Sequence, residues 1–271
     1  MTITTRDQLI DAMGNNTSRI VINKNSLANS VAGQLFSVWL ATGTPGAGVA
    51  PTTAVVPTSA TTGALGFTNQ TAPVTSYIAW LSVQSNNTAS NLEIYDRLAH
   101  MGGLSGTVTT AQGALSLVTT DPGVARVGAT DYSDVQWYLE IFTDLGATGV
   151  NATVIVVYDD ASSQTLSAIA LGATPRAGRL YPIVSGTAGR NIRSVTSVTL
   201  SVSTGTAGNF GITATRTRAS LGLLLGNRSE TLDWAQLGLP EIPNNSCLAM
   251  MFVCPTTATG SIRGTGKIIH G

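Results

Sequence analysis

The stretch SVSTGTAGNFGITATR (residues 201–216) is either a glycine-rich ligand-binding loop or a turn between two strands, and the two possibilities imply different folds for the chain. Its three glycines, Gly205, Gly208 and Gly211, raise the question of a phosphate-binding loop. A dinucleotide-binding loop needs G-x-G-x-x-G at the start of a helix, and a P-loop ends in Lys followed by Ser or Thr. Here each glycine follows the last by three residues, and the alternating, β-branched ITATR comes next. The stretch therefore predicts a hairpin turn between two strands, where Gly and Asn supply positive φ.

Short strands with alternating apolar and polar residues are predicted on both sides of this turn. They cover residues 18–23, 34–41, 76–84, 91–98, 134–143, 152–160, 165–171, 178–184, 193–203, 209–216, 247–254 and 261–269. Within 193–203 the alternation shifts register once, near Ser197. Because Gly and Asn turns separate the strands and no helical runs intervene, the predicted fold class is all-β, an antiparallel, jelly-roll-like β-sandwich.

Two short helical segments are also predicted. Residues 4–14 carry Thr5 and Gln8 at capping-box spacing and Gly14 at the position of a C-terminal cap. A helix this short is not stable alone in water, so its apolar stripe must dock on this chain or on a neighbour. Residues 232–243 predict a loop that contains one helical turn.

The N-terminal region differs in character from the rest. Residues 42–76 contain four prolines among many Gly, Thr and Ala, which excludes a long helix or a central strand. We therefore expect two parts. Residues 1–76 would hold the N-terminal helix, short strands and an extended Pro/Gly-rich arm that lies across neighbouring subunits, and residues 77–271 would form the β-sandwich body.

The composition restricts the partners. Only 10% of the 271 residues are charged, the net charge is zero, and the mean hydropathy is +0.22, whereas about 25% of residues are charged in an average globular domain. A nearly neutral surface favours association, so self-association is expected. No basic surface attracts a polyanion and no apolar run reaches the length of a membrane helix, so we expect neither nucleic acid nor a membrane as a direct partner.

Residues for catalysis are scarce. A catalytic triad would need His100, whose neighbours offer Asp96 and Ser105, but no G-x-S-x-G motif surrounds any serine. His100 precedes two glycines and is interpreted as a turn residue. A hydrolase remains an alternative, with Asp96, His100 and Asp131 as the residues to test. His270 is expected at a frayed or docked chain end.

No metal site or cofactor site is predicted either. Asp159 and Asp160 follow a strand and indicate a hairpin turn, while Asp-x-Asp-x-Asp loops and zinc spacings do not occur. The prediction is therefore a protein that is not an enzyme, with no catalytic, cofactor-binding or metal-binding residues and no cofactors.

Aromatic residues and cysteines leave two alternatives open. Trp80, Trp137, Tyr138 and Tyr95 lie within strands, where they either pack in a core or form a carbohydrate-stacking face. Cys247 and Cys254 are seven residues apart in one predicted strand. Their side chains would point to opposite faces of the sheet, and the strand between them would span about 23 Å, so they cannot pair with each other. They are either buried free thiols or partners in an intermolecular disulfide.

Several stretches together resemble a group of tailed-bacteriophage structural proteins. They are FSVWLATGTPGAGVAP, EIYDRLAHMGGLSGTVTTAQ, ATVIVVYDD, PRAGRLYPI and IRSVTSVTLSVSTGTAGNFGITATR. The resemblance runs from about residue 34 to residue 216 and supplies no catalytic residues. It implies a virion component of β-sandwich or jelly-roll fold, made in the host bacterial cytoplasm. The later residues are either the last strands of the sandwich or an added interaction element.

On this resemblance we expect a capsid decoration or cement subunit that stabilises the phage head through contacts between subunits. The major capsid protein would be its main partner, besides further copies of itself, and it would be located in the virion. The alternative is a tail, collar or fibre component that binds a host-surface glycan through exposed Trp and Tyr side chains.

Overall fold

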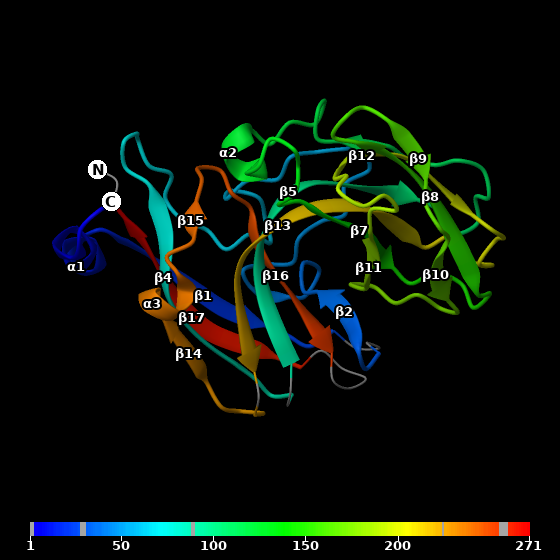
Figure 1. Cartoon of the computed structure of the whole chain (residues 1–271). Coiled ribbons are helices and arrows are strands. Elements are labelled where there is room, and N and C mark those ends of the chain that lie inside the picture. Colours follow the sequence, from blue (N-terminus) through cyan, green and yellow to red (C-terminus); the bar gives the residue numbers. More distant parts are fainter. Residues whose placement is uncertain (1–2, 28–30, 88–89, 224, 255–259) are drawn as a thin grey trace.

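The computed structural model describes residues 3–27, 31–87, 90–223, 225–254 and 260–271, and shows an antiparallel all-β sandwich, which confirms the predicted fold class (Figure 1). The three helices are α1 (Arg6–Asn15), α2 (Val124–Val127) and α3 (Trp234–Leu237) among these residues. The strands of the first half are β1 (Thr17–Lys24), β2 (Gln34–Ser37), β3 (Gly43–Thr44), β4 (Ser76–Ser85), β5 (Ser90–Leu104), β6 (Leu115–Ser116) and β7 (Gln136–Thr143). Those of the second half are β8 (Val150–Tyr158), β9 (Ser163–Thr165), β10 (Ile169–Gly172), β11 (Leu180–Ile183), β12 (Ile192–Leu200), β13 (Asn209–Leu223), β14 (Glu230–Asp233), β15 (Glu241–Ile242), β16 (Leu248–Cys254) and β17 (Ile262–His270).

The strands form three sheets, which we call A, B and C. Sheet A has the order β14-β4-β17-β1-β3, with β15 also beside β4. Sheet B has the order β11-β7-β13-β5-β16-β2, and sheet C the order β10-β8-β12-β6, with β9 beside β8. In Figure 1 sheet A lies on the left and sheet C on the right, while sheet B runs between them. Its long strands β5 and β13, of 15 residues each, join the two halves of the molecule.

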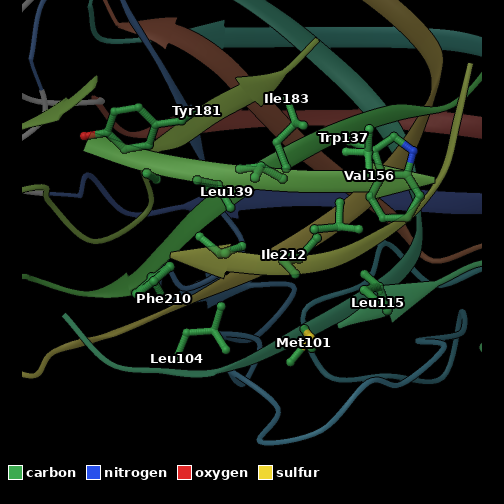
Figure 2. Close-up of a cluster of buried hydrophobic side chains, with 14 of the residues drawn as sticks. Met101, Leu104, Leu115, Trp137, Leu139, Val156, Tyr181, Ile183, Phe210 and Ile212 are labelled. Carbon is green, nitrogen blue, oxygen red and sulfur yellow. The ribbon is translucent and has the colours of Figure 1, made fainter. Parts of the chain in front are cut away.

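Sheet B packs against both other sheets through one of its faces. At one end β7 and the first residues of β13 meet sheet C, and Trp137, Leu139 and Ile212 belong to this core (Figure 2). At the other end Leu92, Leu221 and Phe252 meet sheet A in a second core. The alternation of strand side chains gives sheet B a second face, and this one buries a third cluster that includes Trp39, Tyr95 and Tyr138.

The edge strands of sheet B meet at one point, so the sheet closes on itself there. Phe36 of β2 bridges Arg179, which precedes β11, and the N–H of Ser37 donates to the carbonyl of Gly178 at 2.7 Å. The third cluster is thereby enclosed between the strands of sheet B and the residues that follow β2.

Helix α1 begins and docks as local sequence predicts. The Thr5 side chain accepts a hydrogen bond from the N–H of Gln8, and the Gln8 side chain accepts one from the N–H of Thr5, which completes the capping box. Leu9 and Ala12 pack against Ala79 and Ile269 of sheet A. The apolar stripe of the helix therefore docks on its own chain.

The predicted arm packs on its own chain over part of its length, and its expected path across neighbouring subunits stays a prediction. Residues 42–76 contain few strand residues, but Val55 forms a β-bridge with His100 and Leu65 one with Leu248. Ala64 of this segment is buried beside Trp39 in the third cluster, because the closed sheet leaves an apolar surface that the segment covers. The boundary at residue 76 stays a prediction, and β1 pairs with β17 across it.

The predicted hairpin at residues 201–216 is wrong in its pairing. β12 belongs to sheet C and β13 to sheet B, so the turn carries the chain from one sheet to the other. Gly205 and Gly208 have φ of 88° and 51°, as expected of a turn. Gly211 has a different role, because a Cβ there would lie 1.8 Å from the Met101 carbonyl oxygen. It permits the close approach of β5.

Candidate functional site

Two networks of buried charged side chains lie at the centre of sheet B, and they start from adjacent residues. Asp96 and Arg97 follow each other in β5 and point to opposite faces of the sheet. Both side chains are fully buried. Arg97 lies in the enclosed third cluster, and Asp96 lies between the two cores on the other face.

The Arg97 network satisfies every N–H of its guanidinium. Both terminal nitrogens bind the carboxylate of Glu140 from β7, which is also fully buried. The other donors reach Tyr95 Oη at 3.2 Å, Thr213 Oγ1 at 3.1 Å and His100 Nδ1 at 2.9 Å. A complete set of partners is the condition under which a buried ion pair is tolerated.

Aromatic rings surround the same guanidinium. Arg97 Cζ lies 4.7 Å from the centre of the Trp39 ring, and the Phe142 ring is 6.0 Å away. Burial raises the pKa of the Tyr95 hydroxyl to about 12, so this group stays protonated at neutral pH. The space around Arg97 is therefore occupied by buried side chains of its own chain.

Asp96 is the hub of the second network. Its Oδ1 accepts from Arg126 Nη2 at 2.7 Å and from the N–H of Cys247 at 2.8 Å. Its Oδ2 accepts from Arg126 Nε at 3.1 Å and from Arg218 Nη2 at 3.2 Å. Arg126 belongs to α2, which lies over β5, and it also donates to the Pro57 carbonyl of the arm (Figure 1). One carboxylate thus joins α2, β5, β13 and the start of β16.

His100 is a strand residue rather than the turn residue predicted. It lies in β5, is 2% exposed, and meets the Trp39 ring edge-on at 5.6 Å. Burial, together with the charge of Arg97, lowers the pKa of His100 to about 2. Since Nδ1 accepts from Arg97, the neutral ring carries its proton on Nε2. The Nδ1 lone pair is thus occupied by a hydrogen bond.

His100 predicts a loss of stability in acid. Between pH 6.5 and about 2 the unfolded chain binds a proton that the folded chain does not, so stability falls as the pH falls through this window. The slope for one such group is at most about 1.4 kcal/mol per pH unit. His100→Asn keeps an acceptor near Nδ1 but does not titrate. In urea unfolding between pH 7 and 4, the free energy of unfolding should therefore fall less steeply with pH for His100→Asn than for the natural chain. Equal slopes of this free energy against pH would contradict the account.

The structure does not bring together the three residues proposed for a hydrolase. Asp131 is exposed and accepts from the N–H and Oγ of Ser133, which lower its pKa. Asp96 is held by two arginines, and His100 is held by Arg97. Asp159 and Asp160 follow β8 and bind Arg190, and the turn joins β8 to β9 as predicted. That the chain is not an enzyme stays a prediction.

Sequence reasoning did not identify the buried ion-pair roles of Glu140, Arg126 and Arg218. The one available signal was Glu140 itself, because it stands in a strand whose neighbours on both faces are apolar or aromatic. A charge at such a position implies a buried partner, but the sequence does not identify it. Among the described residues no group of three or more His, Cys, Asp or Glu side chains is arranged to hold a metal ion.

Cys247 is a free and fully buried thiol, as one of the two alternatives held. Burial raises its pKa to about 12, which leaves almost no thiolate at neutral pH. The side chain of Cys254 lies outside the described residues, and so does any disulfide that it forms.

We predict that Cys247 does not react with a thiol reagent until the protein unfolds. In the variant Cys254→Ser, Ellman's reagent at pH 8 should release no chromophore from the native protein and one equivalent in urea. A full equivalent from the native variant within seconds would contradict the burial of this thiol.

The aromatic residues divide between the two alternatives. Trp137, Tyr138 and Tyr95 are buried, which confirms core packing for these three. Trp80 is only half-buried on the face of sheet A that points away from sheet B. No helix among the described residues is long and apolar enough to cross a membrane.

No protein-family model and no curated protein sequence matches the chain. Among solved structures, one similar chain comes from a structure of the infectious bursal disease virus Gx strain, with 12% identity, 94% of this chain and 81% of that chain covered, and a TM-score of 0.21. Another comes from the VP2 subviral particle of infectious bursal disease virus, with 10% identity, the same coverage and a TM-score of 0.24. Likeness at such scores carries no argument, and membership of a tailed-bacteriophage family stays a prediction.

Proposed function

We propose that the chain is a structural subunit of a virion and, more finely, a decoration or cement subunit on the head of a tailed bacteriophage. In this proposal it performs no catalysis and is made in the cytoplasm of a bacterial host. Its partners are the major capsid protein and further copies of itself.

The observation that carries the proposal is that several of the few charged side chains are buried and paired inside the fold. Of only 28 formally charged residues in the chain, five are buried inside the fold and paired in two networks. One joins Arg97 to Glu140, and the other joins Asp96 to Arg126 and Arg218. These links connect sheet B with α2 and with the arm segment. Such bracing favours a rigid building block, and the sparsely charged surface that remains favours association.

Strand addition is the proposed mode of contact. β1 pairs with β17 along its whole length, but on its other side β3 reaches only Asn23 and Lys24. Among the described strands, none covers that edge between residues 17 and 22. A segment of a neighbouring subunit that adds there would gain main-chain hydrogen bonds, and burial of apolar surface would add to them.

The stability of particles tests this function. Particles of the encoding virus assembled without the chain should release their DNA at a lower temperature than complete particles. The recombinant chain, when it is added, should bind to these particles and restore the temperature of DNA release. If the added chain does not bind, or if release is unchanged with and without it, the cement role is wrong.

A further inference from the structure

Beside the part that helix α1 covers, the outward face of sheet A carries three rungs of side chains that cross four strands. Residues paired directly in antiparallel strands share one face of the sheet. The rungs are Arg19–Lys267–Trp80–Asp233, Val21–Thr265–Ser82–Thr231 and Asn23–Arg263–Gln84–Ser229. None of these twelve side chains is buried, whereas the alternate residues, such as Ile20, Leu81 and Val83, belong to the core. We call these twelve residues the rung face.

The rung face carries more positive than negative charge. Arg19, Arg263 and Lys267 form no ion pair among the described residues, and Lys267 Nζ donates only to the Met13 carbonyl. Asp233 is the one carboxylate of the rungs, and it caps α3 by accepting from the N–H groups of Ala235 and Gln236. In a chain of zero net charge, three free cations on one face are available to an anionic ligand.

Trp80 adds a flat apolar surface to these charges. It is half-buried in the first rung, next to Lys267, while the other three strand tryptophan and tyrosine residues already considered are buried in cores. The part of an indole ring that solvent can reach offers its negative face to weakly positive C–H groups. The C–H face of a sugar ring has this character and this flatness.

Hydroxyl and amide groups fill the rest of the rung face. Thr231 donates to Ser82 at 2.9 Å, and Ser229 lies 3.4 Å from Gln84. Beyond the third rung a hollow of about 170 Å³ is lined by Gln84, Asn86, Asn227, Ser261 and Arg263. Such groups both donate and accept hydrogen bonds, as sugar hydroxyls require, and the Arg263 guanidinium matches a carboxylate.

We propose that the rung face binds an acidic polysaccharide, with a sugar ring stacked on Trp80 and a sugar carboxylate at Arg263. The three rungs span about 14 Å along the strands and the four strands about 14 Å across, an area that a short oligosaccharide covers. A nucleic acid fits less well, since single strands are held by several stacking rings and a longer track of cations. The inference does not rest on the proposed function, because it concerns a surface that either a head or a tail protein could expose.

Binding to defined polysaccharides tests the proposal. Titration calorimetry would use polygalacturonate and polysialic acid as acidic probes, methyl-esterified polygalacturonate as the uncharged counterpart, and oligo-dT as a polyanion without pyranose rings. We expect at least one acidic polysaccharide to bind, and esterification of polygalacturonate to abolish any binding that it shows. Trp80→Ala and Arg263→Gln should each weaken binding about tenfold, equivalent to ~1.4 kcal/mol.

The matched control is Arg193→Gln, which removes one cation from β12 of sheet C, far from the rung face in Figure 1. It should bind as the natural chain does, and circular dichroism should show all three variants folded. The proposal is overturned if neither acidic polysaccharide binds, or if the methyl ester binds equally. It is also overturned if Trp80→Ala binds unchanged, or if oligo-dT binds as tightly as the polysaccharides. None of these results would affect the virion role.

Discussion

Glu140→Gln is expected to lower the free energy of unfolding by about 3–5 kcal/mol. The substitution keeps the shape of the side chain but leaves the Arg97 guanidinium buried without a countercharge. Arg97 cannot move to water, because Trp39, Phe142 and Tyr95 enclose it. Urea unfolding followed by circular dichroism at pH 7 measures the loss.

The control is Asp144→Asn, which breaks the ion pair between Asp144 and Arg176. That pair has a contact distance of 2.8 Å, and its side chains are 41% and 36% exposed. We expect a loss of about 1 kcal/mol or less. The double variant Arg97→Met with Glu140→Leu should recover much of the loss, since it leaves no unpaired charge. If Glu140→Gln costs no more than Asp144→Asn, the buried pair does not have the proposed role.

Asp96→Asn should be comparably destabilising, by about 3–5 kcal/mol. The amide can still accept from the Cys247 N–H through its oxygen, but its NH₂ group then faces the donors of Arg126 and Arg218. Two buried guanidinium groups lose their carboxylate in one substitution. The arm segment should loosen as well, because Arg126 holds the Pro57 carbonyl. Hydrogen exchange at residues 55–65 would report this loosening.

Asp134→Asn serves as the comparison for Asp96. Asp134 pairs with Arg216 of β13 at 3.0 Å, and the two side chains are 43% and 24% exposed. Its loss should stay near 1 kcal/mol, without faster exchange in the arm. If Asp96→Asn and Asp134→Asn lower the free energy of unfolding equally, burial does not increase the contribution of Asp96 to stability.

Local sequence signals predicted most of the strands and the start of α1. The register shift expected near Ser197 is present as an irregularity between Val195 and Ser197 against β8. The length of β5 was not predicted, because Gly102 and Gly103 resemble a turn. They are needed for a long-range reason, since a Cβ on Gly102 would lie 2.6 Å from the Pro51 carbonyl oxygen. Such a contact with the arm leaves no local mark in the sequence.

The partners in the two networks could not be predicted from the sequence, because they too depend on long-range contacts. Asp96 and His100 attracted attention because they are close in sequence, yet each is bound to residues elsewhere. Arg97 meets Glu140 across 43 positions, and Asp96 meets Arg218 across 122. Which strands neighbour each other decides these pairs, and strand order across three sheets follows from packing rather than from local pattern.

Electron cryomicroscopy of intact particles of the encoding virus tests the central claim, that this chain is a structural subunit of a virion, most directly. We predict density for its three sheets in regular copies on the outside of the head, in contact with the major capsid protein. Density on the tail alone would contradict the decoration role while leaving a structural one. The absence of the chain from purified particles would contradict the central claim.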